Sequence, residues 1–443
     1  MTARPMTMLR DRLGGWLGRK YVERIGRKGI DSSTLALVPE DVLTHFKRKG
    51  LDPVPGAAGD ATGEPMTKVT LPFGMDAWLV TGYQEVRQVL AAPHAFSNDF
   101  TTLSGTPEAM RKPNPGGLGF ADPPDHTRLR RILTPEFTVR RIQRLAPRID
   151  AIVAEQLDAM EKAAAHGQVD VVEHYAWPIP SLMICELLGV PYEDRAEFQR
   201  LSTQRFDLLD GIDAAFGAMT SSNDYLQHIV DGQRRDPGDG LLGMIVQEHG
   251  EEVSDAELVG LADGVLTGGL ETSASMLALG TLVLLRNPEA FRAVRDEDET
   301  VDDVVEELLR YLSVVQMAFP RFAVEDVEIG GRLISRGDIV LCSLLRANRD
   351  EAITQARGAG TGHERFLGMG EFDAARGKLP HLAFGHGLHR CIGAELARME
   401  LRAAYPALLR RFPEMRLAVP ERELSFRKLS IVYGMDSLPV TLG

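Results

Sequence analysis

The chain has 443 residues, of which 44% are hydrophobic and 26% charged, as is ordinary for a globular protein. Its formal net charge of -13 disfavours nucleic acid as the main partner, because phosphate contact requires a basic surface. Three cysteines, Cys185, Cys342 and Cys391, are too few for a disulfide framework and fit a reducing cytoplasm. We find no run of about 20 apolar residues, so no transmembrane helix is expected.

The first 50 residues are expected to form an N-terminal extension, whose first helix, residues 39–49, packs on the body. Residues 1–28 are basic and amphipathic but lack the apolar segment of a signal peptide. A helix lying on a membrane surface is the alternative to one that packs on its own protein. Since no linker or internal repeat interrupts the rest of the chain, residues 51–443 are predicted to form one domain.

The first part of this body alternates between strand-like, irregular and helical patterns. Residues 68–81 hold strand-like sequence broken by Pro72 and Gly74, which predicts a hairpin, and residues 83–90 predict a helix. Residues 96–119 lack a regular pattern, and an irregular segment of this length usually has a function, such as a lid over a substrate. Residues 126–249 are mostly helical in pattern.

A long central helix is predicted to begin after Ser254. Ser254 and Glu257 have the spacing of a capping box, in which each side chain bonds the backbone N–H of the other residue. The helix should end at Arg286, before Asn287 and Pro288, and would span roughly 50 Å. It is apolar almost all round, as a buried central helix is.

The C-terminal third combines paired strands with one more long helix. Residues 324–342 predict paired strands, and a long loop over residues 348–382 follows them. The last helix should occupy residues 391–411, where Pro406 is expected to kink or interrupt it. Strand-like segments close the chain at residues 425–442. The fold class is therefore mainly α with small β-sheets, without regular βαβ alternation.

A glycine-rich loop brings a cysteine to the start of the last helix, with the sequence Phe384-Gly385-His386-Gly387-Leu388-His389-Arg390-Cys391-Ile392-Gly393. A helix N-terminus lowers the pKa of a thiol, and glycines let the backbone approach a flat cofactor. A thiolate in this position could ligate haem iron. The alternatives are a buried structural cysteine and a zinc site formed by Cys391 with His386, His389 and His381.

A stripe of small residues follows the central helix at four-residue steps: Gly260, Gly264, Gly268 and Thr272, with Gly269 beside them. Each glycine costs about 1 kcal/mol relative to alanine in a helix interior, which suggests that something flat or bulky packs there. Close contact with another helix is the alternative. Glu271 and Thr272 have apolar neighbours and need a partner or a function, although the threonine hydroxyl could bond back to its own helix.

Two charged patterns have weaker signals. Glu307 and Arg310 face the same side of a helix, as many surface pairs do. His126 and Arg130 lie four residues apart and could hold carboxylates or phosphates, or could belong to a solvated basic face. A docking face for an acidic protein, or ordinary solvated surface, is expected from two groups of arginines: Arg128, Arg130, Arg131, Arg140, Arg141 and Arg144, and then Arg390, Arg398 and Arg402.

Together and in this order, the motifs resemble the cytochrome P450 family from about residue 39 onward. The cysteine loop is highly specific, and Gly-Gly-Leu-Glu-Thr in the central helix is moderately so. The resemblance implies the family fold, with haem b between the long central helix and the helix of the cysteine loop. It also implies a bacterial soluble haem-thiolate monooxygenase.

The resemblance assigns a role to each matching residue. Cys391 would be the axial thiolate ligand of the iron, and Thr272 with Glu271 would handle oxygen activation and proton delivery. Glu307 and Arg310 would form a buried structural cluster with Arg365. The cofactor-binding residues would be His126, Arg130, Arg321 and His389, which hold the haem propionates, and Phe384, Gly393 and Gly268, which line the haem.

The implied reaction inserts one oxygen atom from O2 into a lipophilic small molecule, such as a fatty acid, terpenoid, steroid or polyketide. Because no Gly-x-Gly-x-x-Gly motif for a nicotinamide or flavin is present, electrons would come from an external ferredoxin and its reductase. A peroxide-driven enzyme and a haem sensor or carrier without turnover are the alternatives. The pocket would be lined by residues 96–118, Leu261, Val265, Gly268, residues 314–317 with Gln316 as a polar anchor, Ile431 and Val432.

Overall fold

The computed structural model describes residues 47–54, 63–71, 75–99, 117–190, 212–355, 368–427 and 432–443. Most of the expected N-terminal extension and first helix lies outside these ranges, as do Arg365 and most of the irregular segment after residue 96. Within them, the end of the expected first helix is a strand instead: Arg48–Lys49 (β1) pairs with Asp52–Pro53 (β2).

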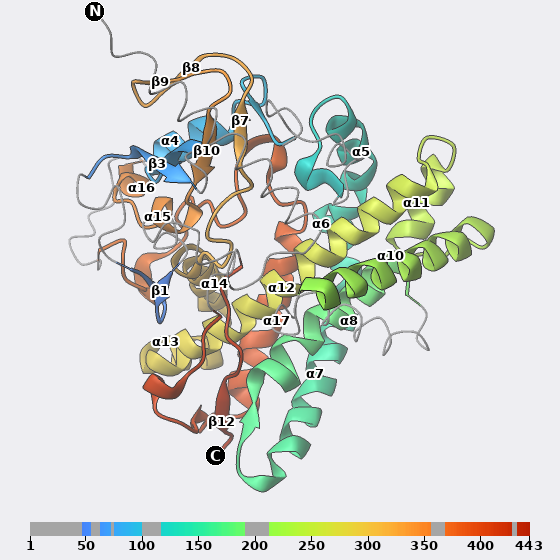
Figure 1. Ribbon diagram of the computed structural model, residues 1–443. Helices are drawn as coiled ribbons and strands as arrows, with labels where there is room; N and C mark the ends of the chain where they lie inside the picture. The colour runs from blue at the N-terminus through green and yellow to red at the C-terminus, as the bar shows by residue number, and fades with distance from the viewer. Residues whose placement is uncertain are drawn as a thin grey trace, which may run out of the picture.

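Helices dominate the described part of the chain, which confirms the fold class expected from the sequence (Figure 1). The α-helices are α4 (Tyr83–Leu90), α5 (Asp125–Leu133), α6 (Val139–Ile142), α7 (Ala146–Ala163), α8 (Pro178–Leu188), α10 (Ile212–Arg235), α11 (Leu241–His249), α12 (Asp255–Arg286), α13 (Pro288–Asp296), α14 (Asp298–Leu312), α15 (Leu344–Ala347), α16 (Ala352–Gln355) and α17 (Ala394–Arg411).

The strands form small sheets in different parts of the molecule: the largest lies at the upper left of Figure 1, whereas β12 of another lies at the bottom, near α7. The largest sheet has the order β3-β4-β10-β7-β5; β3 and β4 form the predicted hairpin, and β10 runs parallel to β4. A second sheet has the order β11-β12-β6, and β8 pairs with β9. Their bounds are β3 (Met66–Leu71), β4 (Met75–Val80), β5 (Phe96–Ser97), β6 (Val169–Asp170), β7 (Arg321–Ala323), β8 (Val327–Ile329), β9 (Arg332–Ile334), β10 (Ile339–Cys342), β11 (Arg416–Leu417) and β12 (Pro439–Thr441).

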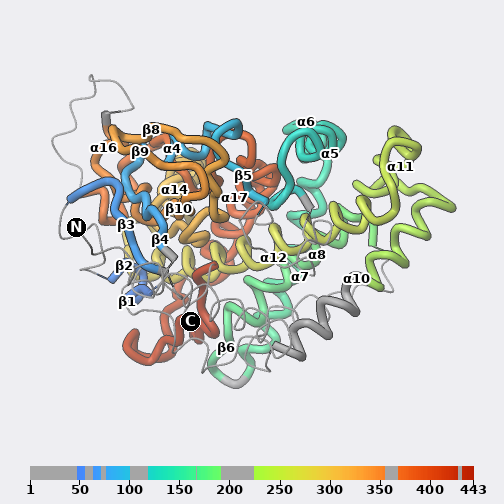
Figure 2. Tube along the Cα trace, turned by 45° about the horizontal axis from the view of Figure 1, so that its top comes forward, coloured from blue at the N-terminus to red at the C-terminus, as the bar shows by residue number. Residues whose placement is uncertain are grey.

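Helix α12 crosses the whole molecule (Figures 1 and 2). It begins with the predicted capping box: the Ser254 hydroxyl accepts from the backbone N–H of Glu257, and the Glu257 carboxylate accepts from that of Ser254. Its length and hydropathy would allow a membrane span, but 72% of its most apolar window is buried inside the protein. Its apolar character is therefore that of a core helix.

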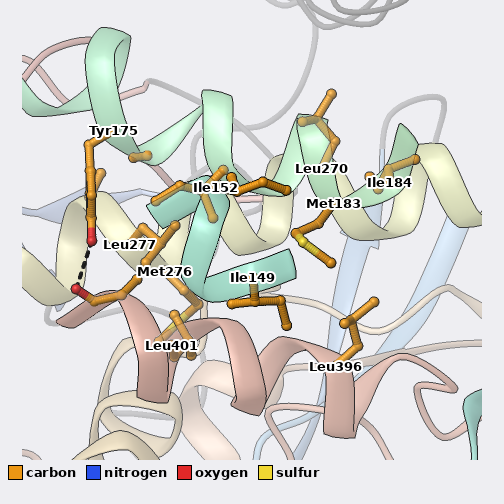
Figure 3. Close-up of a cluster of buried hydrophobic side chains, with 14 of the residues drawn as sticks. Ile149, Ile152, Tyr175, Met183, Ile184, Leu270, Met276, Leu277, Leu396 and Leu401 are labelled. Atoms are coloured by element: carbon orange, nitrogen blue, oxygen red, sulfur yellow. Dashed lines mark hydrogen bonds between the residues drawn. The ribbon is translucent and has the colours of Figure 1, made fainter. Parts of the chain in front are cut away.

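The hydrophobic core surrounds α12. Figure 3 shows side chains from α7, α8 and α17 converging on it, among them Ile149, Met183 and Leu401. The Tyr175 hydroxyl donates to the backbone carbonyl of Ala404 at 2.7 Å, which ties the segment before α8 to α17. Helix α17 continues through Pro406, so the predicted interruption does not occur.

Glu307 and Arg310 form a buried cluster on α14, each with 1% of its side chain exposed. Both nitrogens of the Arg310 fork donate to Glu307 at 2.7 Å, and Arg376 adds a second guanidinium at 3.1 Å. Arg310 also donates to backbone carbonyls of Met369 and Glu371. The cluster thus holds the chain that leads to the cysteine loop, with Arg376 as a partner that the sequence analysis did not anticipate.

Candidate active site

The cysteine loop is shaped by two glycines with left-handed backbone. Gly385 and Gly387 have φ of +68° and +69°, a conformation that glycine adopts at little cost. A Cβ atom on Gly387 would lie 2.1 Å from the carbonyl oxygen of Leu90 in α4, so no larger residue fits there. The Cys391 backbone N–H donates to Phe384 at 2.8 Å. These constraints fix Cys391 just before α17.

Opposing influences act on the Cys391 thiol. The Cys391 side chain faces open space, but protein surrounds it on its other sides. This burial raises the pKa of the thiol. A hydrogen bond from the Gly393 backbone and the positive charges of Arg130, Arg390 and Arg398 lower the pKa. A free thiol here is therefore held mostly protonated by burial, whereas a metal ion would complete the stabilisation of a thiolate.

The middle of α12 opens onto free space. Thr267 and Gly268 are exposed within a helix that is otherwise largely buried, and a Cβ atom on Gly268 would meet nothing within 4 Å. In contrast, a Cβ atom on Gly269 would lie 3.2 Å from Ile184, so this glycine serves close helix contact. Gly268 therefore fits the interpretation that a flat or bulky group packs on α12, whereas Gly269 fits close contact with another helix.

Thr272 and Glu271 face different surroundings. The Thr272 hydroxyl donates to the carbonyl of Gly268 at 2.7 Å, the back-bonding that the sequence left open. The Glu271 carboxylate forms an ion pair with Arg427 of the C-terminal segment. Burial raises the pKa of Glu271, and Arg427 opposes that increase. Arg427 was missed by the sequence analysis, because no local pattern joins residues 156 positions apart.

Four basic residues from three parts of the chain meet near Cys391. The rings of His126 and His389 lie 4.3 Å apart between centroids, and Arg130 donates to the Arg390 carbonyl at 2.7 Å. Arg321 is 5% exposed and donates to the Phe319 carbonyl at 2.7 Å. Burial and the charges of Arg321, His126 and Arg130 lower the pKa of His389 to about 3.

This cluster has unused capacity for an anion. His126 is fully buried, and neither ring nitrogen has a hydrogen-bond partner among the described residues. No carboxylate forms an ion pair with Arg130 or Arg321 within the described part of the chain, although Asp122 is near enough to influence Arg321. Buried donors and charges without partners are costly. The residues present therefore fit a group with two carboxylates, as haem has, next to a thiol that can bind iron.

Phe384 belongs to a rigid network behind the cysteine loop. The Arg398 guanidinium lies over the Phe384 ring at 4.6 Å and makes two hydrogen bonds to Glu306. His381 Nε2 lies 3.1 Å from the same carboxylate. These partners hold the pKa of Glu306 at about 2 against the effect of burial. With His381 engaged in this way, and no group of three or more metal-binding side chains among the described residues, the zinc alternative has no support.

One expectation about the pocket changes, and one contact was not expected. The Gln316 side chain is fully buried and accepts a hydrogen bond from Arg48 at 2.9 Å, so it ties β1 to the body and does not serve as a polar anchor for substrate. Conversely, Phe319 is 47% exposed and its ring lies 4.7 Å from that of Phe120. The contact between Phe120 and Phe319, which lies two residues before Arg321, was not identified from the sequence.

The comparisons with known proteins agree with this geometry. A family model described as Cytochrome P450 matches residues 68–227 and 180–416. Cytochrome P450 165C4 of Amycolatopsis orientalis is 42% identical over 380 residues, or 86% of this chain and 89% of the relative. Cytochrome P450 monooxygenase PikC of Streptomyces venezuelae is 41% identical over 394 residues, or 88% of this chain and 91% of the relative.

A solved structure shows the same fold. The P450 StaH from glycopeptide antibiotic biosynthesis is 41% identical, with a TM-score of 0.80, and the match covers 90% of this chain and 99% of that one. Both the sequence and the arrangement of the elements are thus shared across nearly the whole length. The chain belongs to the cytochrome P450 family and is an oxidoreductase of the monooxygenase type, with haem as its cofactor.

Proposed function

We propose that the protein inserts one oxygen atom from O2 into a C–H bond of a lipophilic small molecule. Two electrons from an external ferredoxin-type donor and two protons reduce the other oxygen atom to water. The observation that carries the proposal is the cluster of His126, Arg130, Arg321 and His389, whose charge and hydrogen-bonding capacity are unmet beside the Cys391 thiol. A haem group with two propionates would supply both the anions and the iron.

In this proposal each candidate residue acts on the haem or its surroundings. Cys391 would ligate the iron, and the Gly393 N–H would stabilise its sulfur. Gly268 allows close approach at α12, while the network behind Phe384 keeps the cysteine loop rigid. When bound, haem supplies the iron at which O2 is activated. The chain determines the orientation of that group and controls the entry of water and protons.

Thr272 and Glu271 are proposed to serve oxygen activation and proton delivery. The Thr272 hydroxyl donates within the helix at Gly268, where α12 faces open space, so it can exchange that bond for one to a water or an oxygen molecule. Glu271, one residue earlier, has a pKa that burial raises, which suits a group that must both release and accept a proton near neutral pH.

The substrate is proposed to be a lipophilic natural product, with fatty acids, terpenoids, steroids and polyketides among the candidates. The pair of Phe120 with the exposed Phe319 favours an apolar or aromatic compound. StaH, which takes part in glycopeptide antibiotic biosynthesis, adds peptide-derived compounds to those worth testing.

The electron donor is proposed to dock on the cysteine side. A surface hollow of about 530 Å³ lies there, lined by α5, the turn after it and Leu388 of the cysteine loop, with Arg130 and Arg131 at its edge. Many of the arginines expected to form a basic face are already paired with acidic residues, among them Arg128 with Glu257. We also propose that residues 51–443 act as one haem-binding unit in the cytoplasm, which the low number of cysteines favours.

The absorption spectrum of the reduced protein under carbon monoxide tests the proposal. Wild-type protein should show the strongly red-shifted Soret band of thiolate-ligated haem, and Cys391→His should lose that shift while it keeps haem. An unchanged spectrum in Cys391→His would exclude Cys391 as the ligand. Addition of lipophilic compounds should shift the iron spin state for the substrate class. Product formation with a ferredoxin and its reductase would then separate a monooxygenase from a haem sensor or carrier.

A further inference from the structure

The carboxylate of Glu271, in the central helix α12, pairs with Arg427 of the C-terminal segment. Arg427 Nη1 pairs with Glu271 Oε1, and both side chains are largely buried, with 20% and 14% of their surfaces exposed. The Arg427 guanidinium also lies 5.4 Å from the ring centre of Trp177, at the start of α8. An arginine placed between a carboxylate and an indole ring is fixed from two sides.

Arg427 itself belongs to a C-terminal segment that borders the proposed pocket. Its backbone N–H donates to Gly434 at 3.0 Å, and the neighbouring rings of Phe426 and Tyr433 stack. Val432 forms a bridge with Val315, in the turn expected to line the pocket. A Cβ atom on Gly434 would lie 3.4 Å from the guanidinium carbon, so the segment closes tightly over Arg427.

The electrostatic surroundings of Glu271 depend on this one partner. Among the described residues, Arg427 is the charged side chain that shifts the pKa of Glu271, and it acts against burial. Trp177, just before α8, is an uncharged neighbour of Arg427, and the carboxyl of Glu400 in α17 interacts with Ser273. Removal of the arginine would leave a desolvated carboxyl with no compensating charge.

We propose that Arg427 is a positioning residue for proton delivery, which fixes the Glu271 carboxylate to the C-terminal segment and stabilises its ionised form. This inference rests on the proposed function of Glu271. An opposite charge within about 4–6 Å lowers the pKa of a carboxyl group by about 1–3 units. Loss of the Arg427 charge should therefore raise the pH at which Glu271 becomes protonated by about that amount.

The test is an infrared pH titration of the haem-loaded protein. The carboxylic-acid C=O band that vanishes in Glu271→Gln identifies Glu271, and its half-protonation pH is compared in wild type, Arg427→Gln and Arg427→Lys. Arg427→Gln should raise the midpoint by about 1–3 pH units and Arg427→Lys should largely restore it. The matched control is Arg422→Gln, which removes an exposed arginine of the same C-terminal region and should leave the midpoint unchanged.

An unchanged midpoint in Arg427→Gln, or an equal shift in Arg422→Gln, would overturn the proposal. If Arg427→Gln does not fold, Trp177→Leu provides a second variant, because loss of the ring should loosen the guanidinium and give a smaller upward shift. The acidic limb of the turnover profile should move with the infrared midpoint. If the Glu271→Gln variant instead converts all consumed electrons into product, the proposed role of Glu271 in proton delivery is wrong. The infrared titration still tests separately whether Arg427 sets the protonation of Glu271.

Discussion

The rings of His126 and His389 lie 4.3 Å apart, and the first is fully buried without a hydrogen-bond partner for either nitrogen. Burial, followed by the positive charges of nearby arginines, lowers the pKa values of both histidines. Such an arrangement is unfavourable for the isolated chain and favourable once an anion is present. In the proposed function, the anions that this cluster lacks are the haem propionates.

Replacement of His126 by leucine should weaken haem retention. The variant removes a donor for the anion together with two unsatisfied buried nitrogens, so the fold itself should be affected little. The rate of haem transfer to an excess of a haem-free acceptor should rise about 10-fold or more, because one hydrogen bond to a charged group contributes about 1.5–3 kcal/mol. His94→Leu, at an exposed histidine paired with Glu325, is the control, and an equal rate in both variants would contradict the assignment.

Acid conditions should destabilise the haem-free protein through His389. Its folded-state pKa of about 3 lies below the usual value of 6.5, so the unfolded chain binds a proton that the folded chain does not. The stabilisation is complete above about pH 6.5 and is lost as pH falls toward 3. The melting temperature of His389→Gln should depend less on pH in this window, and an identical slope in wild type and variant would refute the prediction.

Thr272→Ala should uncouple electron use from product formation. Loss of the hydroxyl leaves α12 intact but removes the group proposed to deliver protons beside Gly268. The ratio of hydrogen peroxide to product should therefore rise about 10-fold or more. The chain contains a matched control in Thr281→Ala, since Thr281 makes the same 2.7 Å bond to the carbonyl four residues earlier. Measurement of product and peroxide per electron distinguishes the two, and comparable uncoupling in both would remove Thr272 from the proposed site.

Arg376→Met should destabilise the protein strongly. Its guanidinium is 3% exposed and bonds Glu307, and removal of one member of a buried ionic cluster costs roughly 3–5 kcal/mol. Lys378→Met breaks an exposed pair with Asp302 nearby and should cost less than about 1 kcal/mol. Urea unfolding of the two variants gives the comparison, and a small effect of Arg376→Met would mean that the Glu307 and Arg310 pair suffices alone.

Gly387→Ala should disrupt the cysteine loop. The new Cβ would combine a left-handed backbone with a distance of 2.1 Å to the Leu90 carbonyl. Gly331→Ala isolates the first effect, because Gly331 has φ of +73° and open space, and should cost about 1–2 kcal/mol. We expect haem content to fall only in Gly387→Ala. Equal haem content in both variants would show that the loop moves away from α4 without consequence.

Arg131→Glu should slow reduction by a ferredoxin-type donor. Arg131 lines the hollow on the cysteine side, with 72% of its side chain exposed and only an exposed pair with Glu252. Arg128 is less suitable, because it binds Glu257 at the start of α12. Stopped-flow reduction at low salt should slow several-fold, and the difference should shrink as salt screens the charges. Arg336→Glu, on the exposed turn after β9, is the control for net charge, and equal slowing would remove the docking proposal.

The sequence by itself determined the elements with local signals. The capping box at Ser254 and Glu257 depends on residues three apart, and the hairpin of β3 and β4 depends on a nearby break, so both were predictable. The glycines and Cys391 of the cysteine loop were also recognisable, because their spacing reflects backbone geometry within ten residues.

Only the tertiary structure decided which distant residues meet. Arg427 reaches Glu271 across 156 positions, and Arg376 reaches Glu307 across 69. The hydrogen bond from Arg48 to Gln316 and the contact between the rings of Phe120 and Phe319 also join residues far apart in the sequence. Charge pairing and ring contact depend on distances in space, which a one-dimensional pattern does not encode, whereas capping and turn formation depend on neighbours along the chain.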